Sequence, residues 1–513
     1  MRPATKWLLA IFILMAFHMS ISYSAYTIAT SSQLTKYHNG GGLWNFALDS
    51  FHYHTVATKL ESVLEKGFYD DWLHRNEPLH VKIISIAYYV FKPNPISFAP
   101  INAMAWTASV VGVFLLALLL MNGNKPRAMA CALIYGLWPS SLALSTQLLK
   151  DPFYNLGCVA FVLGWANILS GKRSVLWITS GTLGFLLAVS IRGNQAPVLL
   201  TLVVLAFIFT AWKAREAVLS AFVALTLTIG VQIAPSIELA PATGILLADR
   251  WGAPAEIMGN AKEVKKFQNK KVNDVKALMK KEMGANYTNK LDHQITDWLY
   301  KRYSWYSPGI TFAEKKRILV ALQKRHGSDL TVVLEKWMSP WKYTSLVPDR
   351  IEHIIIEANK YRDSFLTYYL QPADSTKDSA TIFRSVKDVL RYLPRAAIIG
   401  CFAPFPPDWL RARKAGGGAI GIVSGLEMLA VYFLFCGFIY FIAKASTAWH
   451  VKAWLVIFSA VMVLLLGLFV PNIGTLYRMR FIYLLPVIIC GYEGLCLYMD
   501  KISGSLFRAR GRV

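Results

Sequence analysis

The chain has 513 residues, of which 55% are hydrophobic and only 16% are charged, and its mean hydropathy is +0.39. This composition excludes an ordinary soluble protein and is typical of one that crosses a membrane several times. The formal net charge of +24 does not indicate nucleic acid, because no nucleic-acid-binding motif accompanies it. Lys and Arg instead hold loops in the cytoplasm and contact anionic lipid headgroups. Six cysteines without a CxxC pair predict neither a disulfide framework nor a zinc site.

The N-terminal third begins with a short basic segment and an apolar run, Trp7–Ile28. The run is long and lacks a convincing cleavage site, so it predicts an uncleaved first membrane helix. A polar loop at 29–96 follows. It contains two amphipathic patches, Phe51–Leu64 and Leu79–Val90.

Nine further apolar runs are long enough to cross a hydrocarbon core of roughly 30 Å. They lie near residues 98–121, 128–145, 152–170, 174–191, 196–212, 217–235, 419–443, 453–470 and 481–499. The sequence therefore predicts an all-α polytopic membrane protein with about ten transmembrane helices. Its expected parts are a membrane module at 1–235, a polar region with an interfacial segment at 236–410, and a membrane module with a basic tail at 411–513.

The polar region is rich in Lys and aromatic residues, and helical spacing is plausible in Ile318–Leu334 and Ile351–Tyr369. The segment Tyr392–Leu410 is apolar but carries four prolines, so we expect it to be re-entrant or interfacial. One interpretation of the region is a small helical domain with a solvated basic face. The other is a platform that holds an acceptor, with aromatic rings stacking on sugars.

Charge predicts the topology. The short connections that carry Lys or Arg all fall on one side of the membrane if the N-terminus is cytoplasmic, which is the positive-inside pattern. These connections are Asn122–Arg127, Ser170–Ser174, Trp212–Glu216, Ala443–Lys452 and the tail Lys501–Val513. Both termini are then cytoplasmic, and the first loop and the polar region lie outside. A bacterial inner membrane is the expected location.

The outer face collects ionisable residues at helix ends, where proximity to hydrocarbon makes them costly and therefore candidates for function. They are Asp49, Lys150, Asp151, Arg192, Arg478 and Arg480. Guanidinium groups bind phosphate and stay charged, and phosphate is the headgroup of a polyprenyl carrier. A carboxylate opposite it could take a proton from an acceptor hydroxyl, while arginines stabilise the leaving phosphate.

Each of these residues also has a structural interpretation. Asp49 and Asp151 precede helices and could be capping residues. The arginines could be interfacial anchors, and His52 and His54 could be ordinary surface residues.

Three stretches carry a resemblance to a known family. They are Asp49–Ala57, in which Tyr53 follows the Asp; Glu77–Phe91 with Asn102 in the next span; and Leu149–Phe153, which contains Lys150, Asp151 and Pro152. Softer matches are Ser190–Arg192 and Asn472–Arg480 followed by Leu485-Pro486. Together they resemble the GT-C superfamily of polyprenyl-phosphate-sugar-dependent membrane glycosyltransferases, in the branch of protein O-mannosyltransferases and lipid A aminoarabinose transferases.

The resemblance covers residues 1–235 and implies a GT-C-like helical bundle. It implies that Asp49 is the catalytic base, or orients the acceptor, and that Asp151 supports the active site. The expected substrate-binding residues are Tyr53, His52, His54, Glu77, Lys150, Arg192, Arg478 and Arg480. Some relatives have two adjacent acidic residues in the first loop, whereas Ser50 follows Asp49 here. This difference argues against a metal ion bound there, so the resemblance implies no definite cofactor, and a divalent cation stays an open alternative.

The predicted activity is inverting transfer of a sugar from a polyprenyl-phosphate donor to a hydroxyl of a glycan, lipid or protein. Three rivals stay open: a polymerase or ligase that uses an oligosaccharide on a diphosphate lipid, a transporter, and a non-enzymatic assembly scaffold for envelope polysaccharide. A transporter predicts internal repeats and charges near the bilayer midplane. Most charges here lie at the membrane edges, with Glu427 and Glu493 as exceptions.

Overall fold

A computed structural model describes residues 3–75, 77–233, 261–296, 323, 341–368, 376–378, 381–409 and 417–510. This part of the chain contains helices and two isolated β-bridges, but no β-strand. It forms two compact units. Unit 1 comprises 1–251, 404–462 and 478–513, and unit 2 comprises 252–403 and 463–477. The three-part division expected from the sequence stays a prediction.

Seven helices of the described chain are long and apolar enough to cross a membrane. They are built on α1 (Pro3–Thr30), α5 (Ala99–Leu120), α8 (Asp151–Leu169), α10 (Ala196–Lys213), α20 (Gly417–Lys444), α21 (Trp449–Phe469) and α23 (Leu485–Arg510). Short 3₁₀ turns precede three of them: η2 (Pro95–Phe98), η3 (Gly193–Gln195) and η9 (Phe481–Leu484). The all-α, multi-pass integral membrane protein expected from the sequence is thus confirmed.

The three other predicted spans form shorter helices. The run at 128–145 becomes α6 (Lys125–Gly136) and α7 (Pro139–Ser145), bent by 59° at the break between them. The run at 174–191 is α9 (Val175–Ile191), and the run at 217–235 is α11 (Val218–Ile233), which follows η4 (Arg215–Ala217). The bent pair would be an eighth crossing if it forms one span, so the number ten stays a prediction.

Glycine allows the closest helix contacts in unit 1. A Cβ placed on Gly184 of α9 would lie 2.3 Å from the backbone nitrogen of Phe161 in α8, and one on Gly164 of α8 would lie 2.3 Å from that of Gly181. Small residues let membrane helices approach until their backbones touch. Because α8 and α9 pack this tightly, the start of α8 and the end of α9 are held close together.

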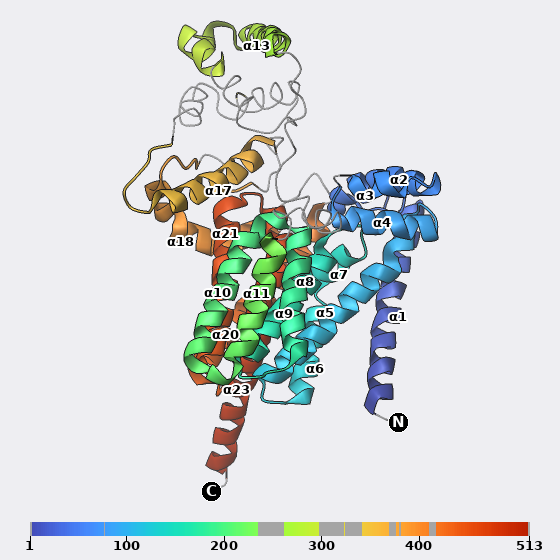
Figure 1. Cartoon of the computed structure of the whole chain (residues 1–513), viewed down its shortest axis with the longest axis vertical. Coiled ribbons are helices and arrows are strands. Elements are labelled where there is room, and N and C mark those ends of the chain that lie inside the picture. The colour runs from blue at the N-terminus through green and yellow to red at the C-terminus, as the bar shows by residue number, and fades with distance from the viewer. Residues whose placement is uncertain are drawn as a thin grey trace. The chain divides into compact units, whose positions relative to one another are not determined.

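The first loop folds into three helices, α2 (Asp49–Glu65), α3 (Tyr69–His74) and α4 (Leu79–Val90), after the turn η1 (Asn45–Ala47). The helices α2 and α4 match the two predicted amphipathic patches, and they pack on each other. In unit 1, Figure 1 shows α2, α3 and α4 at the end of the bundle opposite the N- and C-termini.

Unit 2 contains α13 (Ala261–Met283), η7 (Gly284–Asn286), α17 (Asp349–Tyr368) and α18 (Val386–Phe402). The helix expected at Ile351–Tyr369 is α17, whereas Ile318–Leu334 lies outside the described residues apart from position 323. Arg362 of α17 is buried and donates to the carbonyl oxygen of Leu468 at 2.7 Å, and its guanidinium stacks on Phe383. The predicted interfacial segment forms the end of α18 and the short α19 (Pro406–Trp409) in unit 1.

Candidate functional site

An ion pair joins the first loop to the last membrane segment. Asp49 is the first residue of α2, and Arg478 lies on α22 (Ile473–Arg480). Nη2 of Arg478 lies 2.8 Å from Oδ2 of Asp49. The Asp49 side chain is 44% exposed and that of Arg478 is 20% exposed. This pair is therefore accessible from solvent on the carboxylate side.

A second ion pair lies deeper. Asp151 opens α8 and Arg192 follows the last residue of α9, so the tight α8–α9 contact brings them together. Nη2 of Arg192 donates to Oδ1 of Asp151 at 2.7 Å, with side-chain exposures of 5% and 6%. The other carboxylate oxygen, Oδ2, lies 3.6 Å from Nε of Arg478.

We call Asp49, Arg478, Asp151 and Arg192 the charge network. Its members come from four separate elements and alternate in sign along one line of contacts. Two carboxylates balance two guanidinium groups, so the network is formally neutral. The opposite charges compensate one another away from water, and Arg478 is the more exposed of the two arginines.

Tyr154 contacts Arg192 and forms a hydrogen-bonded cluster with Tyr483 and Gln195. The guanidinium of Arg192 lies 4.3 Å from the ring centre of Tyr154, a cation–π contact. The hydroxyl of Tyr154 lies 2.6 Å from that of Tyr483, and both hydroxyls donate to the amide oxygen of Gln195. Sequence reasoning missed these residues. Tyr154 and Gln195 each lie three positions after a predicted site residue, Asp151 and Arg192, and that spacing was the available signal.

Tyr53 lies about one helical turn after Asp49 on α2 and packs against His80 of α4. Their rings meet edge to face with centroids 4.4 Å apart. Burial, with the Asp49 carboxylate as the next cause, raises the pKa of Tyr53 well above its usual value, so its phenol stays a hydrogen-bond donor. Burial and the charge of Lys150 lower the pKa of His80 to about 3. His80 is therefore a neutral packing residue at physiological pH.

The remaining predicted site residues are not part of the charge network. His52 is exposed, and Nδ1 of His54 lies 2.8 Å from the hydroxyl of Tyr88 on α4. The backbone N–H of Glu77 donates to Arg75. Lys150 immediately precedes Asp151. Arg480 is buried and donates to Sδ of Met428 on α20 at 2.9 Å. The structure thus brings Asp49, Asp151, Arg192 and Arg478 into one line of contacts, whereas Arg480 is directed to α20.

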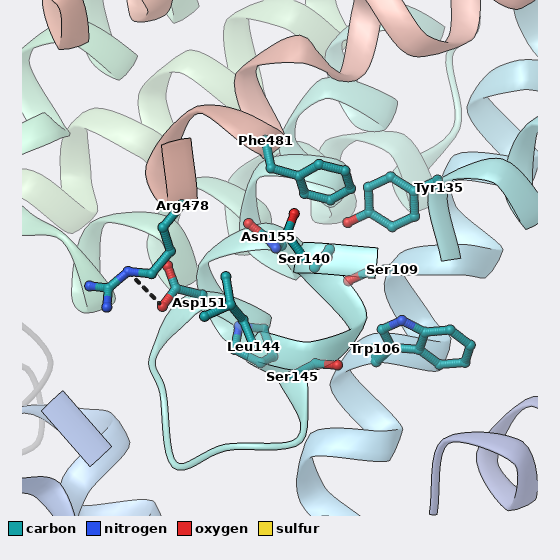
Figure 2. A pocket seen from close by; sticks show the side chains of 12 residues that line it. Trp106, Ser109, Tyr135, Ser140, Leu144, Ser145, Asp151, Asn155, Arg478 and Phe481 are labelled. Carbon is teal, nitrogen blue, oxygen red and sulfur yellow. Dashed lines mark ion pairs between the residues drawn. The ribbon is translucent and has the colours of Figure 1, made fainter. Parts of the chain in front are cut away.

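A cavity adjoins the charge network inside unit 1 (Figure 2). Arg478 and Asp151 lie at one end of it, and Trp106 lies at the other. Four serines of α5 and α7 contribute to its lining, together with Asn155 and the aromatic residues Tyr135 and Phe481. Its wall therefore combines neutral polar groups with apolar and aromatic ones, and charge lies at one end.

Glu427 of α20 binds Ser140, which lines this cavity just after the break between α6 and α7. Its carboxylate accepts the backbone N–H of Ser140 at 2.5 Å and the Ser140 hydroxyl at 2.8 Å. This interior carboxylate of α20 thus caps the first turn of α7. In the described ranges, no group of three or more His, Cys, Asp or Glu side chains is arranged to hold a metal ion.

Comparison of the chain with protein families, with curated proteins and with solved structures finds no match.

Proposed function

We propose that the protein is an integral membrane glycosyltransferase of GT-C type. It takes a sugar from a polyprenyl-phosphate donor and transfers it to a hydroxyl of a glycan, lipid or protein acceptor on the extracytoplasmic side. A bacterial inner membrane with both termini in the cytoplasm fits the loop charges. The observation that carries the proposal is the charge network, which places a half-exposed carboxylate 2.8 Å from a guanidinium at the end of a membrane bundle.

Arg478 is the phosphate ligand in this proposal. It is more exposed than Arg192 and already faces an anionic group, the Asp49 carboxylate. A donor phosphate entering here would compete with Asp49 for the guanidinium and leave the carboxylate free to act as a base. Arg192 acts through Asp151, which it holds in place, and Tyr53 offers its phenol beside Asp49.

The reaction follows from these placements. Asp49 takes the proton of the acceptor hydroxyl as its oxygen attacks the anomeric carbon. The bond between that carbon and the phosphate oxygen breaks, and its electron pair leaves on the polyprenyl phosphate. Arg478 stabilises the charge that develops there. Because the attack is opposite the leaving group, the anomeric configuration inverts.

A transporter is the second candidate, favoured by the 59° break between α6 and α7 and by Glu427 at that break. Broken helices at interior charges are typical of transporter binding sites. An oligosaccharide polymerase or ligase would share the phosphate site but use a diphosphate donor.

A doubly labelled donor separates these functions. The protein is reconstituted into liposomes with polyprenyl phosphate sugars that carry one label on the sugar and another on the phosphate. The proposal predicts that the two labels separate when acceptor glycan or lipid is added. Movement of both labels together across the bilayer would instead establish transport, and turnover of only an oligosaccharide-diphosphate lipid would establish the polymerase or ligase.

A further inference from the structure

Asp49 and Asp151 share one counterion. The Arg478 guanidinium lies 2.8 Å from the carboxylate of Asp49 and 3.6 Å from that of Asp151. In the proposed reaction the donor phosphate takes the place of Asp49 on Arg478, so the carboxylate that acts as the base loses its ion pair. A base must stay in a fixed position to reach the acceptor hydroxyl. A second contact, independent of Arg478, therefore has to hold the start of α2.

Gln147 provides such a contact. Its side chain is buried, and its amide oxygen accepts the backbone N–H of Trp44 at 3.2 Å. Trp44 immediately precedes η1, and η1 leads into α2, whose first residue is Asp49. Gln147 itself lies in the connection 146–150 between α7 and α8, four residues before Asp151. One hydrogen bond thus joins the chain just before one carboxylate to the chain just before the other.

Both ends of this hydrogen bond are anchored to membrane helices. Asn102 of α5 donates from Nδ2 to the carbonyl oxygen of Gln147 at 2.8 Å, and both residues are buried. The indole N–H of Trp44 donates to the carbonyl oxygen of Ala25 in α1 at 3.1 Å. The amide of Gln147 carries no charge and does not titrate. Protonation of a carboxylate or arrival of a phosphate therefore leaves the hydrogen bond of Gln147 to Trp44 in place.

We infer that Gln147 is a positioning residue for Asp49. Through Trp44 and η1 it keeps the start of α2 in place relative to α8 while the donor phosphate occupies Arg478. This inference rests on the proposed function and deepens it, because it names what holds the base during the transfer. Gln147 itself touches no substrate in this arrangement.

Gln147→Met tests this role, because it keeps the length of the side chain and removes the amide. The kcat of sugar transfer should fall roughly twofold to tenfold, the equivalent of one neutral hydrogen bond. Affinity for sugar-free polyprenyl phosphate should stay unchanged, because Arg478 is intact. In the Asp49→Asn background, Gln147→Met should slow transfer no further, since Gln147 acts only through Asp49. Rates are taken per folded protein, so a loss of stability alone changes none of these results.

Two further variants make the test specific. Gln33→Met changes an exposed side chain of the same first loop and should alter neither kcat nor carrier affinity. Asn102→Leu removes the hydrogen bond to the Gln147 backbone and leaves the Gln147 side chain intact. It should therefore also lower kcat, and it should have no effect in the Asp49→Asn background.

Gln147→Met and Asn102→Leu proteins with the wild-type kcat would overturn the positioning role while leaving the proposed function standing. So would an equal slowing of transfer by Gln147→Met in the wild-type and Asp49→Asn backgrounds. Wild-type protein that neither binds the carrier nor transfers sugar would instead overturn the proposed function.

Discussion

Asp151 and Arg192 form a deeply buried ion pair, with side chains 6% and 5% exposed. Removing one partner of such a pair leaves the other charge uncompensated away from water. Asp151→Asn should therefore lower the free energy of unfolding by about 3–5 kcal/mol. Thermal unfolding of the purified protein in detergent measures the loss.

Two comparisons make this prediction specific. Asp71→Asn breaks a surface pair with Arg75 at 2.9 Å, where both side chains are about half exposed, and should change stability by less than about 1 kcal/mol. The double variant with Asp151→Asn and Arg192→Gln should recover part of the stability. An Asp151→Asn variant as stable as the wild type would mean that the pair contributes nothing.

His80 makes stability depend on pH. Its pKa is lowered from 6.5 to about 3 by burial first and then by the charge of Lys150, with Asp151 opposing. In this pH range the unfolded chain therefore binds a proton at His80 and the folded chain does not. Stability is lost as pH falls from about 6.5 towards 3. Between pH 6.5 and pH 5 the loss should be about 2 kcal/mol.

His80→Phe tests this assignment, because it keeps the aromatic contact with Tyr53 and removes the titrating group. Both ring nitrogens of His80 lack hydrogen-bond partners, so the substitution breaks no bond of the described chain. Unfolding temperatures measured at pH 7 and pH 5 should differ less in the variant than in the wild type. The same acid sensitivity in both proteins would show that His80 is not its source.

The sequence identified the four charged residues of the network as candidates for function, but it did not show how they pair. Asp49, Asp151, Arg192 and Arg478 stood out because charges at membrane-helix ends are costly. Their contacts join elements far apart in the chain, and no local pattern encodes that proximity. Asn155 and Tyr154 lie in an apolar helix, where a single polar residue resembles ordinary packing. The structure brings them to the site because α8 carries both on the faces next to Asp151.

At the scale of helices, the α8–α9 contact positions half of the charge network. A side chain on Gly184 would force the two backbones apart, because its Cβ would lie 2.3 Å from the nitrogen of Phe161. Gly184→Ala should lower the free energy of unfolding by about 1–3 kcal/mol. It should also reduce activity, because it shifts Arg192 relative to Asp151.

Gly230→Ala in α11 is the control, since a Cβ there meets nothing within 4 Å. Alanine is the better helix former, so this variant should be as stable as the wild type or slightly more stable. Unfolding in detergent and sugar transfer are measured for both. Equal stability of the two variants would mean that the α8–α9 contact adapts without cost.

Hydropathy predicted the positions of the membrane helices because apolar runs are the dominant signal in a bilayer protein. It treated 128–145 as one span and did not place a bend within it. The bend has a local cause: Trp138 has φ −60° and ψ 114° because it precedes Pro139, and a residue before proline is driven out of the helical region. The amphipathic helices α2 and α4 followed from their periodicity, whereas the six-residue α3 is too short to show one.

At the scale of the molecule, the topology predicted from loop charges can be tested by labelling. Lys59 lies exposed on α2, and Lys501 lies exposed near the end of α23. In a chain whose six cysteines are replaced by serine, a membrane-impermeant maleimide added to intact cells should label Lys59→Cys but not Lys501→Cys. Permeabilised cells should show labelling of both. Labelling of Lys501→Cys in intact cells would reverse the orientation.

A transfer assay on membranes shows whether Asp49 is the base of a sugar transfer. Membranes containing wild type, Asp49→Asn or the control Asp70→Asn are given a radiolabelled polyprenyl-phosphate sugar, and transfer to acceptor is followed. Asp70 lies on α3 with a side chain 93% exposed. Asp49→Asn should be expressed at the wild-type level but transfer sugar roughly 100-fold or more slowly, while Asp70→Asn should be unaffected. Transfer by Asp49→Asn at the wild-type rate would contradict the role of Asp49 as the base.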